Sequence, residues 1–272
     1  MAKIYSHSRL STFEQCPLKF KFRYIDKIIP EIKETIESHL GRTVHDTLEW
    51  LYTEVQKGKI PSIEEVITCY TQKWEESYKK EMLIVKKEFT VKDYFNKGVQ
   101  FIVDYYTKHH PFDDNTLEVE KKIIIDLDKD GEYKILGFID RLSHDIEKNE
   151  YEIHDYKTAN NLPMKEQIDN DRQLALYSIA IKELFGEDKK VCLTWHYLAH
   201  NKKICSNRTN EQLQKLKEET LKLIRQIEAT KTFPPYVSRL CDWCEYKKDI
   251  CTVWNKNNEE DEKGKQDELD IW

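Results

Sequence analysis

Residues 116–158 read TLEVEKKIIIDLDKDGEYKILGFIDRLSHDIEKNEYEIHDYKT. β-Branched and aromatic residues are frequent here, and the turn-forming segments DKDG and EKNE interrupt them, so we expect three or four consecutive β-strands. Near the end, Asp155 and Lys157 are two residues apart, and residues at that spacing share one face of a strand. Taken alone, the pair is as compatible with a structural ion pair as with a functional site.

The regions on both sides of this stretch have helical patterns. Between Ser8 and Tyr24 the apolar residues form a helical stripe that Pro17 interrupts. Further elements are expected as helices at about 41–57, with interruptions over 62–109, at about 165–185 and at about 209–230, and as a strand in KVCLTWHYL at 190–198. This order predicts a mixed α/β core with a helical insertion at about 58–110.

The composition of the 272-residue chain is that of a globular protein, with 35% charged and 39% apolar residues. No apolar run could span a membrane and the first residues lack the apolar core of a signal peptide, so we expect a cytoplasmic protein without a membrane partner. The net charge of the chain is −6, but its N-terminal segment is basic, since residues 1–30 carry six basic and two acidic groups. Residues 255–272 carry seven acids and three lysines and are expected to form an acidic, disordered tail outside a single domain of residues 1–254.

Three charged residues of the strand region could form one site. Asp140 precedes Asp155 by fifteen residues with a turn between them, so a hairpin would bring Asp140 to the same cleft as Asp155 and Lys157. Two close carboxylates repel each other unless a cation lies between them, and Mg²⁺ prefers oxygen ligands. A lysine beside such a metal can orient or deprotonate the attacking water and stabilise charge on a phosphate. The set therefore suits hydrolysis of a phosphodiester.

The segments GFID and HDYKT resemble the active site of the PD-(D/E)XK nucleases, specifically their RecB-like branch. Three more segments resemble motifs of that branch: GRTVHDTLEWL with His45, RQLALYSIA with Gln173 and Tyr177, and SHSRLSTFEQCPLKFKFRYI with Cys16. The resemblance extends over about residues 5–252. It implies a restriction-endonuclease-like α/β fold, a mixed sheet flanked by helices, in which the helical insertion caps the cleft of a single nuclease domain.

The resemblance also implies roles for individual residues. His45, Asp140 and Asp155 would hold Mg²⁺ or Mn²⁺ together with the backbone carbonyl of Tyr156, and Lys157 would be the catalytic lysine. Gln173 and Tyr177, four residues apart and so on one face of a helix, would contact DNA or support the site. Without the other motifs, His45 would be interpreted as a core or capping histidine. Glu118 and Glu120 could reach the site from the first strand, but alternation at a sheet surface explains them equally well, and they are left out of the site.

Three of the seven cysteines, Cys241, Cys244 and Cys251, are clustered in CDWCEYKKDIC. A tetrahedral site needs a fourth thiolate, for which the chain offers Cys16, Cys69, Cys192 and Cys205, and the spacing alone leaves zinc and iron–sulfur open. The resemblance points to Cys16 and a 4Fe–4S cluster, because one RecB-like branch, which includes CRISPR-associated nucleases, joins its N-terminal segment to a C-terminal cysteine triplet. The last gap is one residue longer than the usual form. We expect a cysteine-cluster segment at 236–254 and the other three cysteines in the core.

These features predict a metal-dependent DNA nuclease, an exonuclease on single-stranded DNA ends that acts in repair, recombination or defence. An alternative within the same class is a CRISPR adaptation nuclease that trims spacer precursors. No G-x-x-x-x-G-K-[ST] motif occurs in the sequence, so a helicase would have to be a partner, as would the integrase in CRISPR adaptation. An alternative from another class is a non-catalytic iron–sulfur DNA-binding subunit, against which the complete set of site residues argues.

Overall fold

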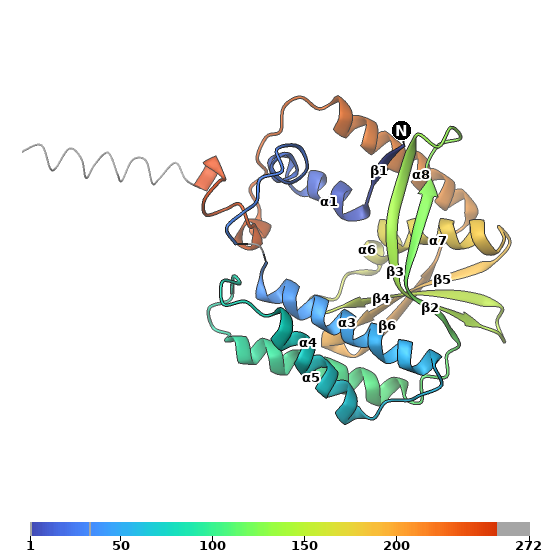
Figure 1. The fold of residues 1–272 in the computed structure, drawn as a ribbon. Coiled ribbons are helices and arrows are strands. Elements are labelled where there is room, and N and C mark those ends of the chain that lie inside the picture. Colours follow the sequence, from blue (N-terminus) through green and yellow to red (C-terminus); the bar gives the residue numbers. More distant parts are fainter. Residues whose placement is uncertain (1, 33, 255–272) are drawn as a thin grey trace, which may run out of the picture.

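The computed structural model describes residues 2–32 and 34–254 and has a six-stranded mixed sheet at its centre (Figure 1). The expected strand region forms three antiparallel strands, β2 (Thr116–Asp126), β3 (Tyr133–Asp145) and β4 (Glu150–Lys157). The sheet continues with β5 (Lys190–Tyr197), which is parallel to β4, and with β6 (Lys202–Asn207), which is antiparallel to β5. A short first strand, β1 (Lys3–Tyr5), runs parallel to the start of β3.

Strand β3 pairs with three other strands, β1, β2 and β4. Strand β2 pairs with it along one edge, from Lys134 to Ser143. The other edge is divided, because β1 pairs with residues 133–135 and β4 pairs with residues 141–145. Residues 136–140 therefore have no strand partner on that edge, and Asp140 lies where the pairing with β4 ends.

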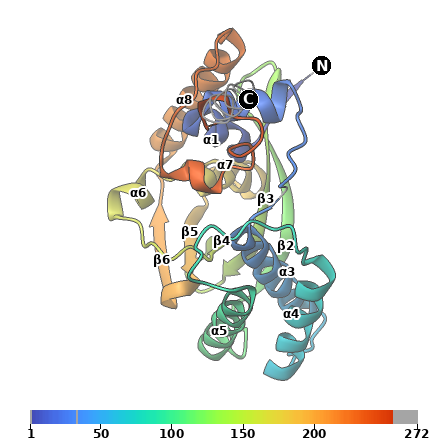
Figure 2. The same cartoon turned by 90° about the vertical axis from the view of Figure 1, so that its left-hand side faces the viewer.

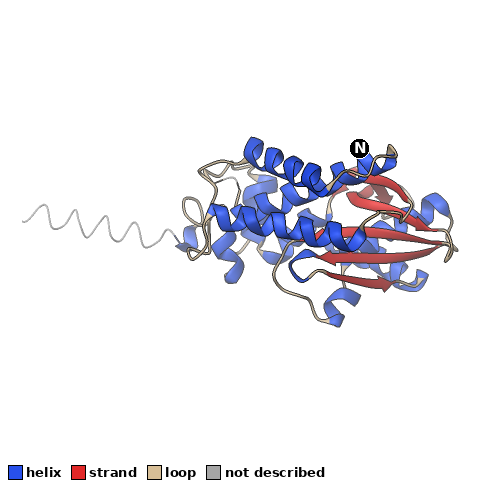
Figure 3. Ribbon diagram, turned by 90° about the horizontal axis from the view of Figure 1, so that it is seen from below, coloured by secondary structure: helices blue, strands red, loops and turns tan. Residues whose placement is uncertain are grey.

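Helices cover both faces of the sheet (Figures 1 and 3). One hydrophobic core joins the sheet to α1 (His7–Gln15), α7 (Arg172–Phe185) and α8 (Asn210–Ala229). A second core joins α3 (Ile36–Gln56), α4 (Ile63–Ser77) and α5 (Val91–His109), and it reaches the opposite face of the sheet through Tyr156 of β4. Figure 2 shows the two groups of helices above and below the strands. The mixed α/β core with its helical layer is thus present as expected.

Local capping explains where the helices of the second core begin. Helix α3 starts at Ile36, earlier than the expected residue 41, because the side chain of Thr35 accepts a hydrogen bond from the Ser38 N–H. Helices α4 and α5 open with capping boxes, formed by Ser62 with Glu65 and by Thr90 with Asp93. Helix α3 then runs along the sheet past the unpaired edge of β3, and this places its middle turns near Asp140.

Two of the expected helices are divided in the structure, the first of them at Pro17, where the sequence predicts an interruption. The N-terminal helix is divided into α1, α2 (Pro17–Phe20) and η1 (Lys21–Ile25), because Pro17 restarts the helix at a first-turn position. The expected helix at 165–185 is divided into α6 (Lys165–Asp169) and α7, because Asp171 accepts a hydrogen bond from the Leu174 N–H and caps α7. Two short helical turns complete the described chain, η2 (Leu198–His200) and η3 (Arg239–Trp243).

No helix of residues 2–32 and 34–254 combines the length and the apolar character that a membrane crossing requires. The expected acidic tail at 255–272 lies outside the described residues.

Candidate active site

The structure brings His45, Asp140 and Tyr156 together at the unpaired edge of β3. The last residue pair of β3 and β4 is Arg141 with His154. Beyond this pair, Asp140 Oδ2 accepts a hydrogen bond from the Tyr156 N–H at 3.0 Å. On α3, His45 Nδ1 lies 3.2 Å from Asp140 Oδ2, and His45 Nε2 lies 2.6 Å from the Tyr156 carbonyl oxygen. An aspartate and a histidine therefore bind the backbone of β4 where a neighbouring strand would otherwise do so.

Both ring nitrogens of His45 face oxygen acceptors, which favours the protonated imidazole. Burial opposes this charge, but the hydrogen bond to Asp140 and the charges of Asp140 and Asp155 outweigh it and raise the pKa of His45 to about 9. In the protein without metal, His45 is therefore a cation at neutral pH. It must lose a proton before it can bind a metal ion.

Asp155 and Lys157 point to the same side of β4, as their spacing predicts. The Asp155 side chain is buried, with 3% of the residue exposed, and its Oδ2 lies 2.7 Å from Lys157 Nζ but accepts no well-aligned hydrogen bond. Burial raises the pKa of Asp155 to about 6; Lys157 opposes this shift and the neighbouring Asp140 adds to it. Burial opposes the charge of Lys157, but the charge of Asp155 outweighs burial and raises the pKa of Lys157 to about 12.

Gln173 and Tyr177 reach the same region from α7. Gln173 Oε1 accepts a hydrogen bond of 3.3 Å from Lys157 Nζ, so this residue orients the lysine. One turn further along, Tyr177 covers Gly137 of β3, and a Cβ atom at Gly137 would lie 2.3 Å from the Tyr177 ring. The segment GFID thus needs a glycine at this position because the tyrosine packs directly on the backbone.

Glu120 belongs to this region, although the sequence analysis left it out. Val119 pairs with Arg141 and Lys121 with Ile139, so Glu120 lies across from Asp140. Its backbone has a φ of 46°, in the left-handed region, and this departure from strand geometry redirects its side chain. Burial and the charge of Asp140 raise the pKa of Glu120 to about 7. The register of the hairpin is the signal that could have identified it, whereas alternation along one strand could not.

Glu118, by contrast, is exposed and forms an ion pair with Lys121. Leaving Glu118 out of the site agrees with its position in the structure.

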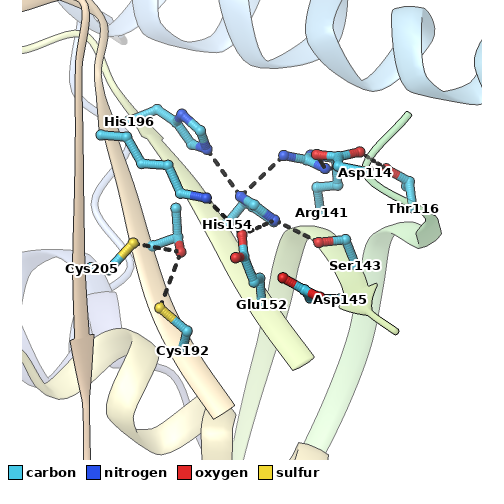
Figure 4. A network of polar contacts seen from close by, with 12 residues as sticks. Asp114, Thr116, Arg141, Ser143, Asp145, Glu152, His154, Cys192, His196 and Cys205 are labelled. Atoms are coloured by element: carbon cyan, nitrogen blue, oxygen red, sulfur yellow. Dashed lines mark hydrogen bonds and ion pairs between the residues drawn. The ribbon is translucent and has the colours of Figure 1, made fainter. Parts of the chain in front are cut away.

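A buried polar network supports β4 from the side opposite to Asp155 (Figure 4). Arg141 is 1% exposed, forms an ion pair with Asp114, and donates hydrogen bonds to the Tyr156 hydroxyl at 3.1 Å and to His154 Nδ1 at 3.0 Å. His154 also lies 2.9 Å from His196 Nε2. Arg141 therefore fixes the ring of the same tyrosine whose backbone binds Asp140 and His45. The sequence analysis did not find this network, because its members come from several elements.

The four cysteines expected to form a cluster line one small cavity, of about 50 Å³, between the N-terminal helices and η3: Cys16, Cys241, Cys244 and Cys251. Backbone N–H groups lie near two of the sulfurs, since the Tyr236 N–H donates to Cys16 Sγ at 3.4 Å and the Ser238 N–H to Cys241 Sγ at 3.5 Å. The two segments are also joined by an ion pair between Lys19 and Glu245 at 2.8 Å. The cysteine-cluster segment thus packs on the N-terminal segment.

The expectation that the other three cysteines pack in the core is correct only for Cys192. Cys205 is exposed because it lies on the edge strand β6, and Cys69 on α4 is half-buried.

In the part of the chain that the structure describes, no three His, Cys, Asp or Glu side chains are placed to hold one metal ion. At the sheet, the candidate ligands bond to groups of the protein instead, His45 to Asp140 and Asp155 to Lys157. The donor set nevertheless fits a hard divalent cation, because it offers two carboxylates, a backbone carbonyl and an imidazole. The poorly satisfied Oδ2 of the buried Asp155 is a further feature that a cation would compensate.

Comparison with known proteins identifies the family. The chain matches the model of the PD-(D/E)XK nuclease superfamily over residues 4–252. No curated protein matches it. Among 23 matching chains of solved structures is the crystal structure of SSO0001, which is 17% identical; the match covers 71% of this chain and 97% of that chain and has a TM-score of 0.36. The expected restriction-endonuclease-like fold is confirmed by the family match and the mixed sheet flanked by helices. The chain belongs to the PD-(D/E)XK nuclease superfamily.

Proposed function

We propose that the protein is a Mg²⁺- or Mn²⁺-dependent exonuclease that hydrolyses single-stranded DNA from its ends. Membership of the superfamily implies a metal-dependent nuclease that acts on DNA. The observation that carries the assignment in this chain is the position of Asp155 and Lys157, 2.7 Å apart and beside Asp140 and His45 at the edge of β3. A buried carboxylate with a raised pKa next to a lysine is more typical of a reactive site than of a surface ion pair.

The proposed metal ligands are the side chains of His45, Asp140 and Asp155 and the carbonyl of Tyr156. A divalent metal bound there would polarise the phosphate and lower the pKa of a bound water. Against the effect of burial, the charge of Asp155 raises the pKa of Lys157 in the metal-free protein, and the charged lysine would stabilise negative charge on the phosphate. Gln173 holds the lysine through its hydrogen bond.

The finer assignment to the RecB-like branch rests on the order of the motifs along one domain of residues 1–254. His45 precedes Asp140, the pair of Asp155 and Lys157 follows, and α7 then supplies Gln173, which bonds Lys157. We propose a cytoplasmic role in DNA repair, recombination or defence, in which unwinding is supplied by a helicase partner. Trimming of spacer precursors beside a CRISPR adaptation integrase is the second candidate, and it uses the same site.

We further propose that Cys16, Cys241, Cys244 and Cys251 hold a 4Fe–4S cluster, with zinc as the alternative. The support is their position around one cavity and the N–H groups directed at two sulfurs, which stabilise thiolates. Protein purified without air should be yellow-brown and contain iron and sulfide. Zinc alone in the metal analysis would contradict the cluster and leave the four-cysteine site intact.

The function is tested with end-labelled linear and circular single-stranded DNA and with duplex DNA, each with Mn²⁺, Mg²⁺ or chelator. The parent should degrade linear single strands only with metal and should spare circles. Asp140→Ala should abolish cleavage, and Asp145→Ala is the matched control because it removes a carboxylate from the exposed end of the same strand. A folded parent that binds DNA but never cuts it would instead support the non-catalytic DNA-binding subunit. Cleavage that survives Asp140→Ala would refute the proposed site.

A further inference from the structure

A second cavity, of about 770 Å³, lies next to the candidate active site and takes no part in it. Its walls come from the first turns of α3 and α5, from residues 158–161 after β4, and from Trp243 of η3. It begins directly after Lys157, since Thr158 lines it. Gly41, one helical turn before His45, packs against Thr158, where an added Cβ atom would lie 3.2 Å from the threonine hydroxyl. The cavity therefore lies beside the elements that carry His45 and Lys157.

Aromatic and amide side chains line this cavity. Phe89 is 44% exposed and Trp243 is half-buried, so both rings have free surface. Three asparagines, Asn96, Asn160 and Asn161, add hydrogen-bonding groups at exposed positions of the wall. Flat rings with nearby amide groups are the surfaces on which unpaired bases stack and form hydrogen bonds.

Two lysines and two acids line the cavity. Burial and the positive charge of Lys86 lower the pKa of Lys97, while Glu37 only partly opposes them. The acids are held by hydrogen bonds within the protein, because Asp93 accepts the Thr90 N–H at 2.7 Å in the cap of α5 and Glu37 accepts the Tyr94 hydroxyl at 2.7 Å, so the two lysines are the groups that can face a phosphate. A phosphate near the two lysines would relieve their mutual repulsion.

We propose that this cavity binds unpaired nucleotides of a DNA single strand next to the scissile phosphate, with Phe89 and Trp243 stacking on bases and with Lys86 and Lys97 facing phosphates. This inference rests on the proposed nuclease function, since it assigns the strand on which that site acts. The volume lies within the range of roughly 300–1,000 Å³ typical of pockets that enclose a small ligand, which admits a short run of nucleotides and not a duplex.

The inference also gives the cysteine-cluster segment a part in substrate binding. Trp243 stands between Cys241 and Cys244, at the end of η3. A metal or cluster held by the four thiols would fix the backbone that carries one of the two stacking rings.

The test is a binding experiment with a fluorescently labelled oligo(dT) strand of about 20 nucleotides. The buffer contains EDTA, so that no metal-dependent cleavage occurs, and the Kd is measured by fluorescence anisotropy. Phe89→Ala and Trp243→Ala should each raise the Kd about tenfold, the effect expected when one stacked base loses its aromatic partner. Trp243→Phe should restore most of the affinity because it keeps a ring. Phe185→Ala is the matched control, since Phe185 is a partly exposed phenylalanine at the end of α7 and lines neither this cavity nor the one around the cysteines.

The lysines are tested through the salt dependence of the same binding. Lys86→Ala should reduce the slope of log Kd against log salt concentration by about 0.7, the value for loss of one phosphate contact on a single strand. Lys92→Ala is the control, because Lys92 is an exposed lysine of α5 that does not line the cavity. The melting temperatures of all variants are compared with the parent to identify any that have unfolded.

The outcomes separate this inference from the proposed function. If the parent cuts DNA with Mn²⁺ but Phe89→Ala, Trp243→Ala and Lys86→Ala bind oligo(dT) as the parent does, the cavity assignment is overturned and the nuclease stands. If the parent binds oligo(dT) through these residues but never cuts it, the nuclease assignment fails and the binding site remains. If the three variants lose as much affinity for a blunt-ended duplex as for oligo(dT), the proposed preference for a single strand is overturned.

Discussion

Replacing Asp155 with asparagine should stabilise the metal-free protein at pH 8, although it removes the partner of Lys157. The reason is the position of the carboxylate, which is buried beside Asp140 and has a raised pKa. A carboxyl group whose pKa is higher in the folded state than in the unfolded chain favours folding when it is protonated and opposes folding once it is ionised. Asparagine has the shape of the protonated acid and cannot ionise.

The size of this stabilisation follows from the pKa values of Asp155 in the unfolded chain and in the folded protein. The shift of Asp155 from 3.8 to about 6 corresponds to roughly 3 kcal/mol above pH 7, at about 1.4 kcal/mol for each pH unit. For a chain of this length, that gain should raise the Tm by about 5 to 10 °C. Because the penalty grows between the unfolded and the folded pKa, Asp155→Asn should show about half of this gain at pH 5 and little at pH 4.

The assay is thermal and urea unfolding of the parent and Asp155→Asn in EDTA at pH 8 and pH 5, repeated at pH 8 with Mn²⁺. Mn²⁺ should stabilise the parent by binding only the folded state, and this increment should be lost in the variant together with cleavage. Glu147→Gln is a suitable control, because it removes the charge of an exposed carboxylate in the turn between β3 and β4. A lower stability of Asp155→Asn at pH 8 in EDTA would show that the pair with Lys157 is structural and would refute the reasoning.

Three further predictions concern the surroundings of the site. Burial lowers the pKa of His39 to about 4 and that of His154 well below its usual value. At His39 the unfolded chain therefore binds more protons, so the parent should lose stability relative to His39→Gln as the pH drops from 6.5 towards 4, measured as the difference between their urea midpoints in EDTA; a difference that does not change with pH would contradict a neutral buried His39. Gly137→Ala should cost about 1 to 3 kcal/mol of unfolding free energy and reduce cleavage, because the added methyl collides with the Tyr177 ring; parent-like melting would be inconsistent with that packing. Arg141→Met should cost about 3 kcal/mol or more, measured by urea unfolding, because it leaves the buried network without its cation; an equally stable variant would argue against a supporting role.

Much of the fold could be predicted because the strong local patterns survive in the structure. The β-branched stretch from residue 116 forms three strands, and the pair of Asp155 and Lys157 faces one side of β4 as period-two geometry requires. The short strands β1 and β6 could not be predicted, since three residues and the polar segment KKICSN carry no strand signal of their own. Both form because an edge of a longer strand is available to pair with them.

The residues of the candidate site could be predicted where their spacing in the sequence determines their position. They could not be predicted where their position depends on the path of the backbone. Asp140, Asp155 and Lys157 come together because a hairpin of adjacent strands leaves few other arrangements. Glu120 was left out of the site because its left-handed backbone breaks the alternation on which that expectation rested. Arg141 escaped notice because its role depends on partners from distant segments, among them Asp114, which no local pattern connects to it.

Strand β3 pairs with β1 and with β4 on the same edge and leaves a gap between them. This gap explains how the sheet can form without metal while the candidate metal ligands Asp140 and His45 lie at its edge. Where β4 leaves β3 after the pair of Arg141 and His154, the N–H and the carbonyl of Tyr156 lose their ladder partners, and buried backbone groups without partners are costly. Asp140 accepts the first group and His45 binds the second, so two side chains replace a missing segment of strand. The same side chains are among the proposed metal ligands. The fold therefore holds them in place before any cation binds, and a cation would exchange their hydrogen bonds for coordination without movement of a strand.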